Sequence, residues 1–188
     1  MKINVVGVSG SGKTTVGRRL SEALNVSYIE MDRLFWKPNW TEPANDEFFS
    51  RLTEALSKDA WVLDGNYHRT ASIKWQSVDV VIWIDFSITR TLWQASQRAI
   101  RRAIRHEELW PDTNNRESFR RLFSKDSILL WTIRSYRTMK QRYESIMTSD
   151  EYSHIRFIRV RSPKAVDELV KSLAYRQCIY DTNPASNI

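Results

Sequence analysis

The feature of this sequence that most constrains its fold is the stretch at residues 7–14, which reads Gly-Val-Ser-Gly-Ser-Gly-Lys-Thr. It matches the pattern G-x-x-x-x-G-K-[ST] at every fixed position. An apolar, β-branched run at residues 2–8 leads into it, and apolar residues at helical spacing follow it over residues 13–24. In such a strand, turn and helix, backbone N–H groups and the positive end of the helix converge on an anion. The sequence therefore predicts a cradle for a polyphosphate within an α/β fold.

Each position of this loop has an expected role in binding a nucleoside triphosphate. Lys13 is expected to reach the β- and γ-phosphates of ATP, Thr14 to ligate Mg²⁺ through its hydroxyl, and Thr15 to contact the α-phosphate. The glycines let the backbone wrap closely around the phosphates. The predicted cofactor-binding residues are Gly7, Ser9, Gly10, Ser11, Gly12, Lys13, Thr14 and Thr15.

The rest of the chain alternates between strand-like and helix-like patterns. Strands are predicted at residues 2–8, 26–31, 60–63, 78–84 and 155–160. Helices are predicted at residues 13–24, 46–57, 91–106, 119–148 and 164–175. Strands that alternate with helices pair in parallel through right-handed crossovers, so we expect a three-layer α/β fold.

The domain organisation follows from length and from one long connection. The link between the fourth and fifth predicted strands is about seventy residues, far longer than a simple crossover needs. Its helical patterns are separated by turn formers at residues 110–115. We expect a single domain over residues 1–176, with a lid insertion at about 98–142 and a flexible tail at 177–188.

The formal charge of +7 is concentrated in this insertion. Thirteen basic and six acidic residues lie between residues 86 and 146, so this stretch carries the whole excess. Arginines at 98, 101, 102 and 105 share much of one helical face, and arginines at 134 and 137 repeat the three-residue step. Such residues form either a solvated face or a lid that neutralises charge on a transferring phosphoryl group. The charge also leaves nucleic acid open as a partner.

Two acids follow predicted strands at the sheet edge where α/β folds bind ligands, Asp32 and Asp64. Asp32 is expected to take or orient the proton of an acceptor hydroxyl, the alternative being a helix cap or a surface turn. Asp64 is expected to hold Mg²⁺ through a water, with Gly65 and Asn66 approaching the acceptor; a plain Asp-Gly turn is the alternative. Asp85 ends the next apolar run and ranks below Asp64.

Aromatic residues crowd the segment after Asp32. Trp36 and Trp40 are candidates to wall a planar acceptor, although aromatics at this density more often form core. Trp36 is therefore taken as a substrate-binding candidate.

Several other classes of protein are disfavoured by the sequence. No guanine-reading Asn-Lys-x-Asp segment or GTPase switch sequence is present. The amino terminus carries no leader-like pattern and no long apolar run occurs, so we expect a cytoplasmic protein without a membrane partner. The three histidines, at 68, 106 and 154, lack ligand spacing, and the single cysteine, Cys178, excludes an internal disulfide.

The loop at 7–14, Asp32 and the segment Asp64-Gly65-Asn66-Tyr67 together make the chain resemble adenylate-kinase-like P-loop kinases. More narrowly, it is similar to the bacterial DNA topology modulation protein group over residues 1–160. That similarity lies in the segment at 32–40, in Asp-Gly-Asn-Tyr, and in an arginine-rich lid followed by Trp131, Arg134 and Arg137.

The resemblance implies a five-stranded parallel sheet in the order 2-3-1-4-5, with Mg-ATP at the loop. It also implies an acceptor site near Asp32, Asp64 and Asn66. The implied catalytic residues are Lys13, Asp32, Arg98, Arg102, Arg134 and Arg137.

The sequence therefore predicts an ATP-dependent kinase that phosphorylates a small acceptor such as a nucleoside, a nucleotide or another hydroxyl or phosphate compound. Two alternatives stay open. One is a kinase acting on nucleic-acid ends, and the other is a nucleotide-dependent regulator that binds ATP or DNA without phosphorylating an acceptor.

Overall fold

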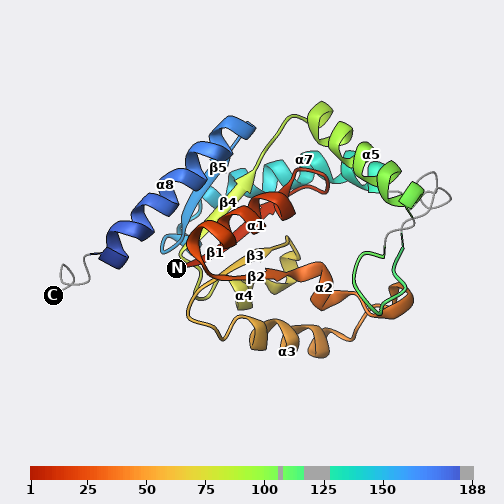
Figure 1. The fold of residues 1–188 in the computed structure, drawn as a ribbon, viewed down its shortest axis with the longest axis horizontal. Coiled ribbons are helices and arrows are strands. Elements are labelled where there is room, and N and C mark those ends of the chain that lie inside the picture. Colours follow the sequence, from red (N-terminus) through yellow and green to blue (C-terminus); the bar gives the residue numbers. More distant parts are fainter. Residues whose placement is uncertain (106–107, 117–127, 183–188) are drawn as a thin grey trace.

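A computed structural model describes residues 1–105, 108–116 and 128–182 of the chain (Figure 1). Its sheet consists of β1 (Lys2–Gly7), β2 (Ser27–Glu30), β3 (Trp61–Asp64), β4 (Val80–Ile84) and β5 (Arg156–Val160). The strands lie in the order β2-β3-β1-β4-β5, and every neighbouring pair is parallel. The predicted α/β fold, five parallel strands and strand order are confirmed.

The register aligns the carboxyl ends of the central strands. Val5 lies opposite Asp64 on β3, and Gly7 lies opposite Ile84 on β4. The glycine-rich loop after β1, the acid that ends β3 and the residues after β4 therefore meet at one edge of the sheet, where parallel α/β folds bind ligands.

Helices cover both faces of the sheet. The helices are α1 (Lys13–Leu24), α2 (Met31–Phe35), α3 (Asn45–Ala55), α4 (Ala71–Lys74), α5 (Ile88–Arg105), α7 (Ile128–Met147) and α8 (Pro163–Thr182). Single 3₁₀ turns occur at Pro38–Trp40 (η1), His68–Thr70 (η2) and Asp150–Tyr152 (η3).

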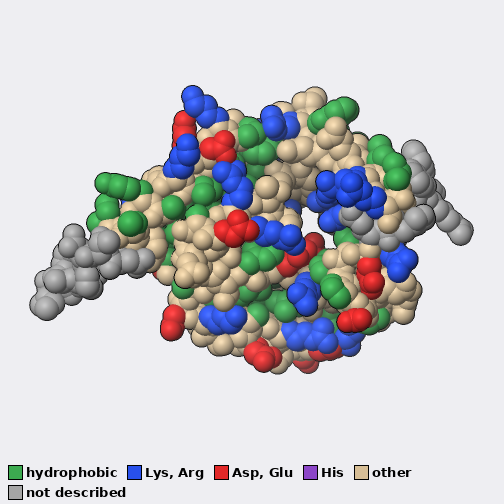
Figure 2. All heavy atoms as spheres, in the orientation of Figure 1, with side chains coloured by type: hydrophobic (Ala, Val, Ile, Leu, Met, Phe, Trp, Pro, Cys, Tyr) green, Lys and Arg blue, Asp and Glu red, His purple; other side chains and the backbone are tan. Residues whose placement is uncertain are grey.

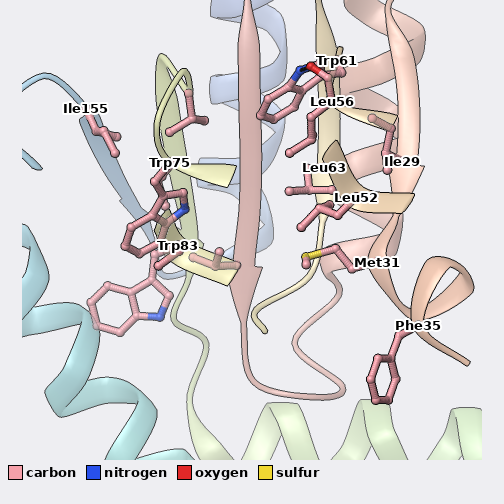
Figure 3. Close-up of a cluster of buried hydrophobic side chains, with 14 of the residues drawn as sticks. Ile29, Met31, Phe35, Leu52, Leu56, Trp61, Leu63, Trp75, Trp83 and Ile155 are labelled. Carbon is pink, nitrogen blue, oxygen red and sulfur yellow. Dashed lines mark hydrogen bonds between the residues drawn. The ribbon is translucent and has the colours of Figure 1, made fainter. Parts of the chain in front are cut away.

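Two separate cores divide the two faces, because successive strand residues point to opposite sides. Val5 packs with Leu20 of α1 and Val170 of α8, whereas its neighbour Val6 packs with Leu52 of α3 and the residues around it. Figure 3 shows part of the second core. Trp75 is buried there and its indole N–H donates to Oδ1 of Asn4 at 2.9 Å, so its polar atom is satisfied.

The largest departure from the predicted elements is at the carboxyl end. The last helix was expected to stop at 175 and a tail to begin at 177, but α8 continues to Thr182. The reason is that residues 177–182 contain neither glycine nor proline, and the first proline after them is Pro184. The rest of the expected tail lies outside the described residues, as do residues 119–127 of the predicted helix at 119–148.

Two short helices were not predicted. The strand expected at 26–31 ends at Glu30 because α2 begins at Met31, and α4 was missed altogether. Within the described residues, no helix is both long and apolar enough to cross a membrane.

Candidate functional site

The glycine-rich loop between β1 and α1 has the backbone geometry of an anion cradle. The N–H of Ser11 donates to the carbonyl of Val8 at 3.2 Å, which folds the loop back on itself. Gly12, the residue before α1, has φ +97°, and no side chain caps this helix end. The first turn of α1 also lacks an acidic residue. The N–H groups and the positive end of α1 therefore face no acidic side chain from the helix's own first turn that would compete with a bound anion.

Gly10 is required by the helix that lies beside the loop. Its φ is +82°, and a Cβ there would stand 2.7 Å from Cβ of Ala95 and 2.9 Å from the carbonyl oxygen of Thr91. Both contacts are too short for a side chain, so the loop can approach α5 only with glycine at this position.

Asn66 braces the loop from the neighbouring strand end. Its Oδ1 accepts from the N–H of Gly7 at 2.9 Å, and its Nδ2 donates to the carbonyl of Gly7. The Nζ of the buried Lys74 in turn donates to the carbonyl of Asn66. The sequence prediction assigned Asn66 to the acceptor. Both polar atoms of its side chain bond to the loop backbone, and its predicted contact with the acceptor stays a prediction.

Lys13 lies within the loop, where its Nζ donates to the carbonyl of Val8 at 3.1 Å. Burial lowers the pKa of Lys13, while the negative charges of Asp64 and Asp32 oppose this shift. A phosphate placed in the cradle would add negative charge beside Nζ and favour the protonated form.

Thr14 and Asp64 meet directly below the loop. The hydroxyl of Thr14 donates to Oδ2 of Asp64 at 2.7 Å, and the hydroxyl of Tyr28 donates to the same oxygen at 2.9 Å. Burial raises the pKa of Asp64, and the charge of Lys13 acts in the opposite direction. Hydroxyl and carboxylate oxygens are ligands that suit Mg²⁺, so these two residues fit the metal role predicted for them.

No described group of three or more His, Cys, Asp or Glu side chains could hold a metal by itself. A magnesium ion at this position would therefore take its remaining ligands from phosphate oxygens and water, which is its usual mode of binding.

Asp85, the other acid at the sheet edge, has a different role. Its Oδ2 accepts from Nε and Nη2 of Arg159 at 2.8 and 2.6 Å, and Arg159 also binds Glu144. This ion pair joins the end of β4 to β5 and α7, which supports the ranking of Asp64 above Asp85 as a metal ligand.

A cavity of about 890 Å³ lies between the loop and α5. The side chain of Arg98 reaches across to the loop, where Nη2 donates to Oγ of Ser9 at 3.2 Å. Figure 2 shows Lys and Arg side chains gathered beside a hollow in this face of the molecule. The residues that line the cavity are Gly10, Gly12, Lys13, Thr14, Thr15, Arg18, Gln94, Gln97, Arg98, Ile100, Arg101, Arg102, Ile104 and Arg105.

The predicted catalytic arginines fall into two groups. Arg98 and Arg102 of α5 line the cavity, but Arg134 and Arg137 of α7 do not. Both α7 arginines are exposed, on a different side of the helix from Thr132, whose hydroxyl donates to the carbonyl of Ser9 at 3.4 Å. This conformation does not bring them to the phosphate cradle. Residues 117–127 of the predicted lid insertion, together with His106 and the side chain of Trp131, lie outside the described residues.

Asp32 stands in the short helix α2 and is exposed. The hydroxyl of Tyr67 donates to its Oδ1 at 2.8 Å. The ring of Tyr67 packs against Phe35 and Phe48, whose ring centres lie 5.0 and 5.2 Å from the centre of the Tyr67 ring. Burial raises the pKa of Tyr67, and the nearby charge of Asp32 adds to this, so Tyr67 stays a proton donor to the carboxylate. Tyr67 belongs to the Asp-Gly-Asn-Tyr motif, but no role for it was predicted from the sequence.

Trp36 belongs to a chain of aromatic rings rather than standing alone. Its ring centre is 4.9 Å from that of Phe35 and 5.3 Å from that of Trp40, and Trp40 lies 6.1 Å from Trp110. All three contacts are edge-to-face, so much of each ring packs on its neighbour. Trp36 is only half-buried, and its predicted contact with an acceptor stays a prediction.

Gly65 is also accounted for by packing. A Cβ at this position would lie 2.6 to 2.8 Å from the side chain of Met31. The space beside its Cα is filled by Met31, and the predicted approach of a ligand to Gly65 stays a prediction.

Comparison with known proteins gives one consistent family. The family model described as shikimate kinase matches residues 9–56. The shikimate kinase of Corynebacterium diphtheriae is 31% identical over 124 residues, which cover 59% of this chain and 68% of that enzyme. That of Corynebacterium efficiens is 38% identical over 100 residues, or 45% of this chain and 57% of the enzyme. The match therefore spans little more than half the length of this second relative.

A solved structure with a similar fold is the shikimate kinase from Acinetobacter baumannii in complex with shikimate. It superimposes with a TM-score of 0.54 at 19% identity, covering 96% of this chain and 93% of that one. At this identity the likeness concerns the fold alone.

Proposed function

Because the chain belongs to the shikimate kinase family, we propose that it is an ATP-dependent phosphotransferase that moves the γ-phosphoryl group of Mg-ATP to a small acceptor. The observation that carries the proposal is the position of Lys13. It lies in the phosphate cradle, where the negative charges of Asp64 and Asp32 raise its pKa against the effect of burial. A lysine at the phosphates, an acid that holds Mg²⁺ and a second acid that can take the acceptor's proton are recurring parts of phosphoryl-transfer sites.

Each part of the site has a distinct task in this reaction. The loop amides and Lys13 hold the phosphates, and Thr14 and Asp64 hold the metal. Mg-ATP supplies the transferable phosphoryl group and a divalent charge when it is bound. Asp32 accepts the proton of the acceptor hydroxyl, while Tyr67 fixes one of its oxygens. Arg98 and Arg102 neutralise charge that develops on the transferring group.

The acceptor is proposed at the level of a class. The relatives are named as shikimate kinases, which supports a hydroxyl compound as acceptor. Nucleosides and nucleotides stay candidate acceptors. Membership of the DNA topology modulation protein group, the narrower resemblance seen in the sequence, stays a proposal. The arginines that line the cavity are the observation that favours a second candidate, a 5′-hydroxyl nucleic-acid end.

The test is ADP release from Mg-ATP across a panel of shikimate-like hydroxy acids, nucleosides, nucleoside monophosphates and 5′-hydroxyl oligonucleotides. One acceptor is expected to stimulate release, and Lys13→Ala and Asp32→Asn are each expected to abolish the stimulation. The exposed Asp59→Asn serves as the matched control and should behave as the unaltered protein. ATP binding that depends on Lys13, with no stimulation by any acceptor, would instead support the nucleotide-dependent regulator.

A further inference from the structure

Tyr28 of β2 contacts the metal-side acid Asp64, although it belongs neither to the phosphate loop nor to either hydrophobic core of the described structure. Its side chain is only half-buried, and it lines a second pocket of about 250 Å³. Its hydroxyl donates to Oδ2 of Asp64 at 2.9 Å. Packing therefore does not account for a tyrosine at this position, and the contact with Asp64 is the feature to explain.

The register of the sheet brings Tyr28 and Asp64 to the same face. Glu30 lies opposite Asp64 in the parallel pair of β2 and β3. Side chains two residues apart on a strand share a face, so the side chain of Tyr28 lies on the same side of the sheet as those of Glu30 and Asp64. A side chain as long as tyrosine is needed to cross from position 28 to the end of the neighbouring strand.

Gly17, in the interior of α1, makes room for the Tyr28 ring. A Cβ at Gly17 would lie 2.9 Å from Cε2 of Tyr28, which is closer than real side chains approach. Glycine inside a helix costs about 0.5–1 kcal/mol relative to alanine. The guanidinium of Arg18, the next residue, stands 5.5 Å from the centre of the same ring. Two consecutive residues of α1 therefore contact the ring whose hydroxyl reaches Asp64.

The two hydroxyls that reach Asp64 use the same oxygen. Thr14 donates to Oδ2 at 2.7 Å, and Tyr28 donates to it at 2.9 Å. A carboxylate oxygen offers about two lone-pair sites, so these two bonds fill Oδ2. Among the described residues, none donates a hydrogen bond to Oδ1. Oδ1 is therefore the oxygen that is left to accept from a water molecule bound to Mg²⁺.

We propose that Tyr28 is a positioning residue for magnesium, because its hydroxyl holds Oδ2 of Asp64 and leaves Oδ1 for the metal. The terminal torsion of an aspartate is broad, so one hydrogen bond from Thr14 does not fix the plane of the carboxylate. A second donor on a different strand does fix it. This inference rests on the proposed function, in which Thr14 and Asp64 hold the metal of Mg-ATP.

The test measures the dissociation constant of ATP by calorimetry, once with EDTA and once with saturating Mg²⁺, and compares the two constants as a ratio. Tyr28→Phe keeps the ring and removes the hydroxyl. It is expected to reduce the gain from Mg²⁺ by about tenfold, since partners that orient metal-binding groups contribute about that much to metal affinity. The constant in EDTA should stay within twofold. Tyr175→Phe, at an exposed position of α8, is the matched control and should keep both constants.

Gly17→Ala reaches the same contact from the other side. Its Cβ displaces the ring of Tyr28 and the hydroxyl with it, so the gain from Mg²⁺ should fall as in Tyr28→Phe. Because both changes act through one hydroxyl, the double variant should lose no more than the larger single loss.

Three results would overturn the role of Tyr28. They are a gain from Mg²⁺ within twofold of normal in Tyr28→Phe, additive losses in the double variant, and ATP binding that Mg²⁺ does not tighten in the unaltered protein. A general loss of structure would weaken both constants alike and leave their ratio unchanged. If no acceptor is phosphorylated by the unaltered protein, the kinase proposal fails, while the two constants still decide whether Tyr28 positions Asp64 for magnesium.

Discussion

At the scale of single residues, the phosphate loop is supported from below by a line of buried polar groups. Lys74 holds the carbonyl of Asn66, and Asn66 holds both backbone polar groups of Gly7. Each of these bonds satisfies a group that burial would otherwise leave unpaired. The position of the loop therefore depends on residues that do not themselves contact a nucleotide phosphate.

Lys74 provides a prediction about stability and pH. Burial lowers its pKa to about 7, below the ordinary value of 10.5. Between these two values the unfolded chain binds more protons than the folded one, so the free energy of unfolding rises with pH by up to about 1.4 kcal/mol per pH unit. Lys74→Met is expected to reduce this slope in urea titrations at pH 7, 8 and 9, while Lys13, whose pKa is also lowered by burial, keeps its own contribution.

Lys171→Met, at an exposed position of α8, is the matched control and should keep the slope. Equal slopes in the two variants would show that Lys74 is not held in a buried, uncharged form. The range ends at pH 9 because the buried tyrosines begin to contribute above it.

At the scale of elements, α5 serves two surfaces at once. A stripe of small residues, including Ala95, Ala99 and Ala103, is buried and lets the helix lie close to the phosphate loop. The face that carries Arg98 and Arg102 lines the cavity. The small size of these alanines therefore determines how closely the arginines of α5 can approach a phosphate bound in the loop.

This division predicts different effects for arginines on α5 and α7. Arg98→Ala is expected to lower kcat/KM for ATP by about tenfold or more, because a charge-assisted hydrogen bond at the loop contributes about 1.5 kcal/mol or more. Arg134→Ala, on the exposed side of α7, is expected to change it by less than about threefold, since that side chain does not line the cavity. A loss at Arg134 as large as the loss at Arg98 would show that α7 moves onto the nucleotide during turnover.

The sequence predicted regular elements better than contacts between distant segments. The bounds predicted for α1 and the strand order of the sheet were right, because hydrophobic periodicity and a glycine-rich turn report directly on local structure. The bracing role of Asn66 was missed, since it depends on a neighbouring strand 59 positions away along the chain. The contacts of the buried Asn115 with the backbone of Lys37 and Trp40 were missed, because no local pattern distinguishes such an asparagine from one that forms a turn.

At the scale of the whole molecule, the ends of the central strands and a group of basic side chains lie at the same edge of the sheet. The carboxyl ends of β1 and β3 bring the phosphate loop and Asp64 together, and α5 adds a basic wall. Residues 113 and 115 accept hydrogen bonds from the N–H groups of Asn39 and Trp40, which follow α2 in the sequence. In the proposed function, the nucleotide lies between the phosphate loop and α5.

The proposed kinase transfers a phosphoryl group between two bound molecules, so the fate of the γ-phosphate is the decisive measurement. ATP labelled at the γ-position is incubated with magnesium, the protein and the stimulating acceptor, and the products are separated. We expect label to appear on the acceptor in a one-to-one ratio with ADP, and Lys13→Ala and Asp32→Asn to prevent this. Label found only in inorganic phosphate, at the same rate with and without acceptor, would contradict it.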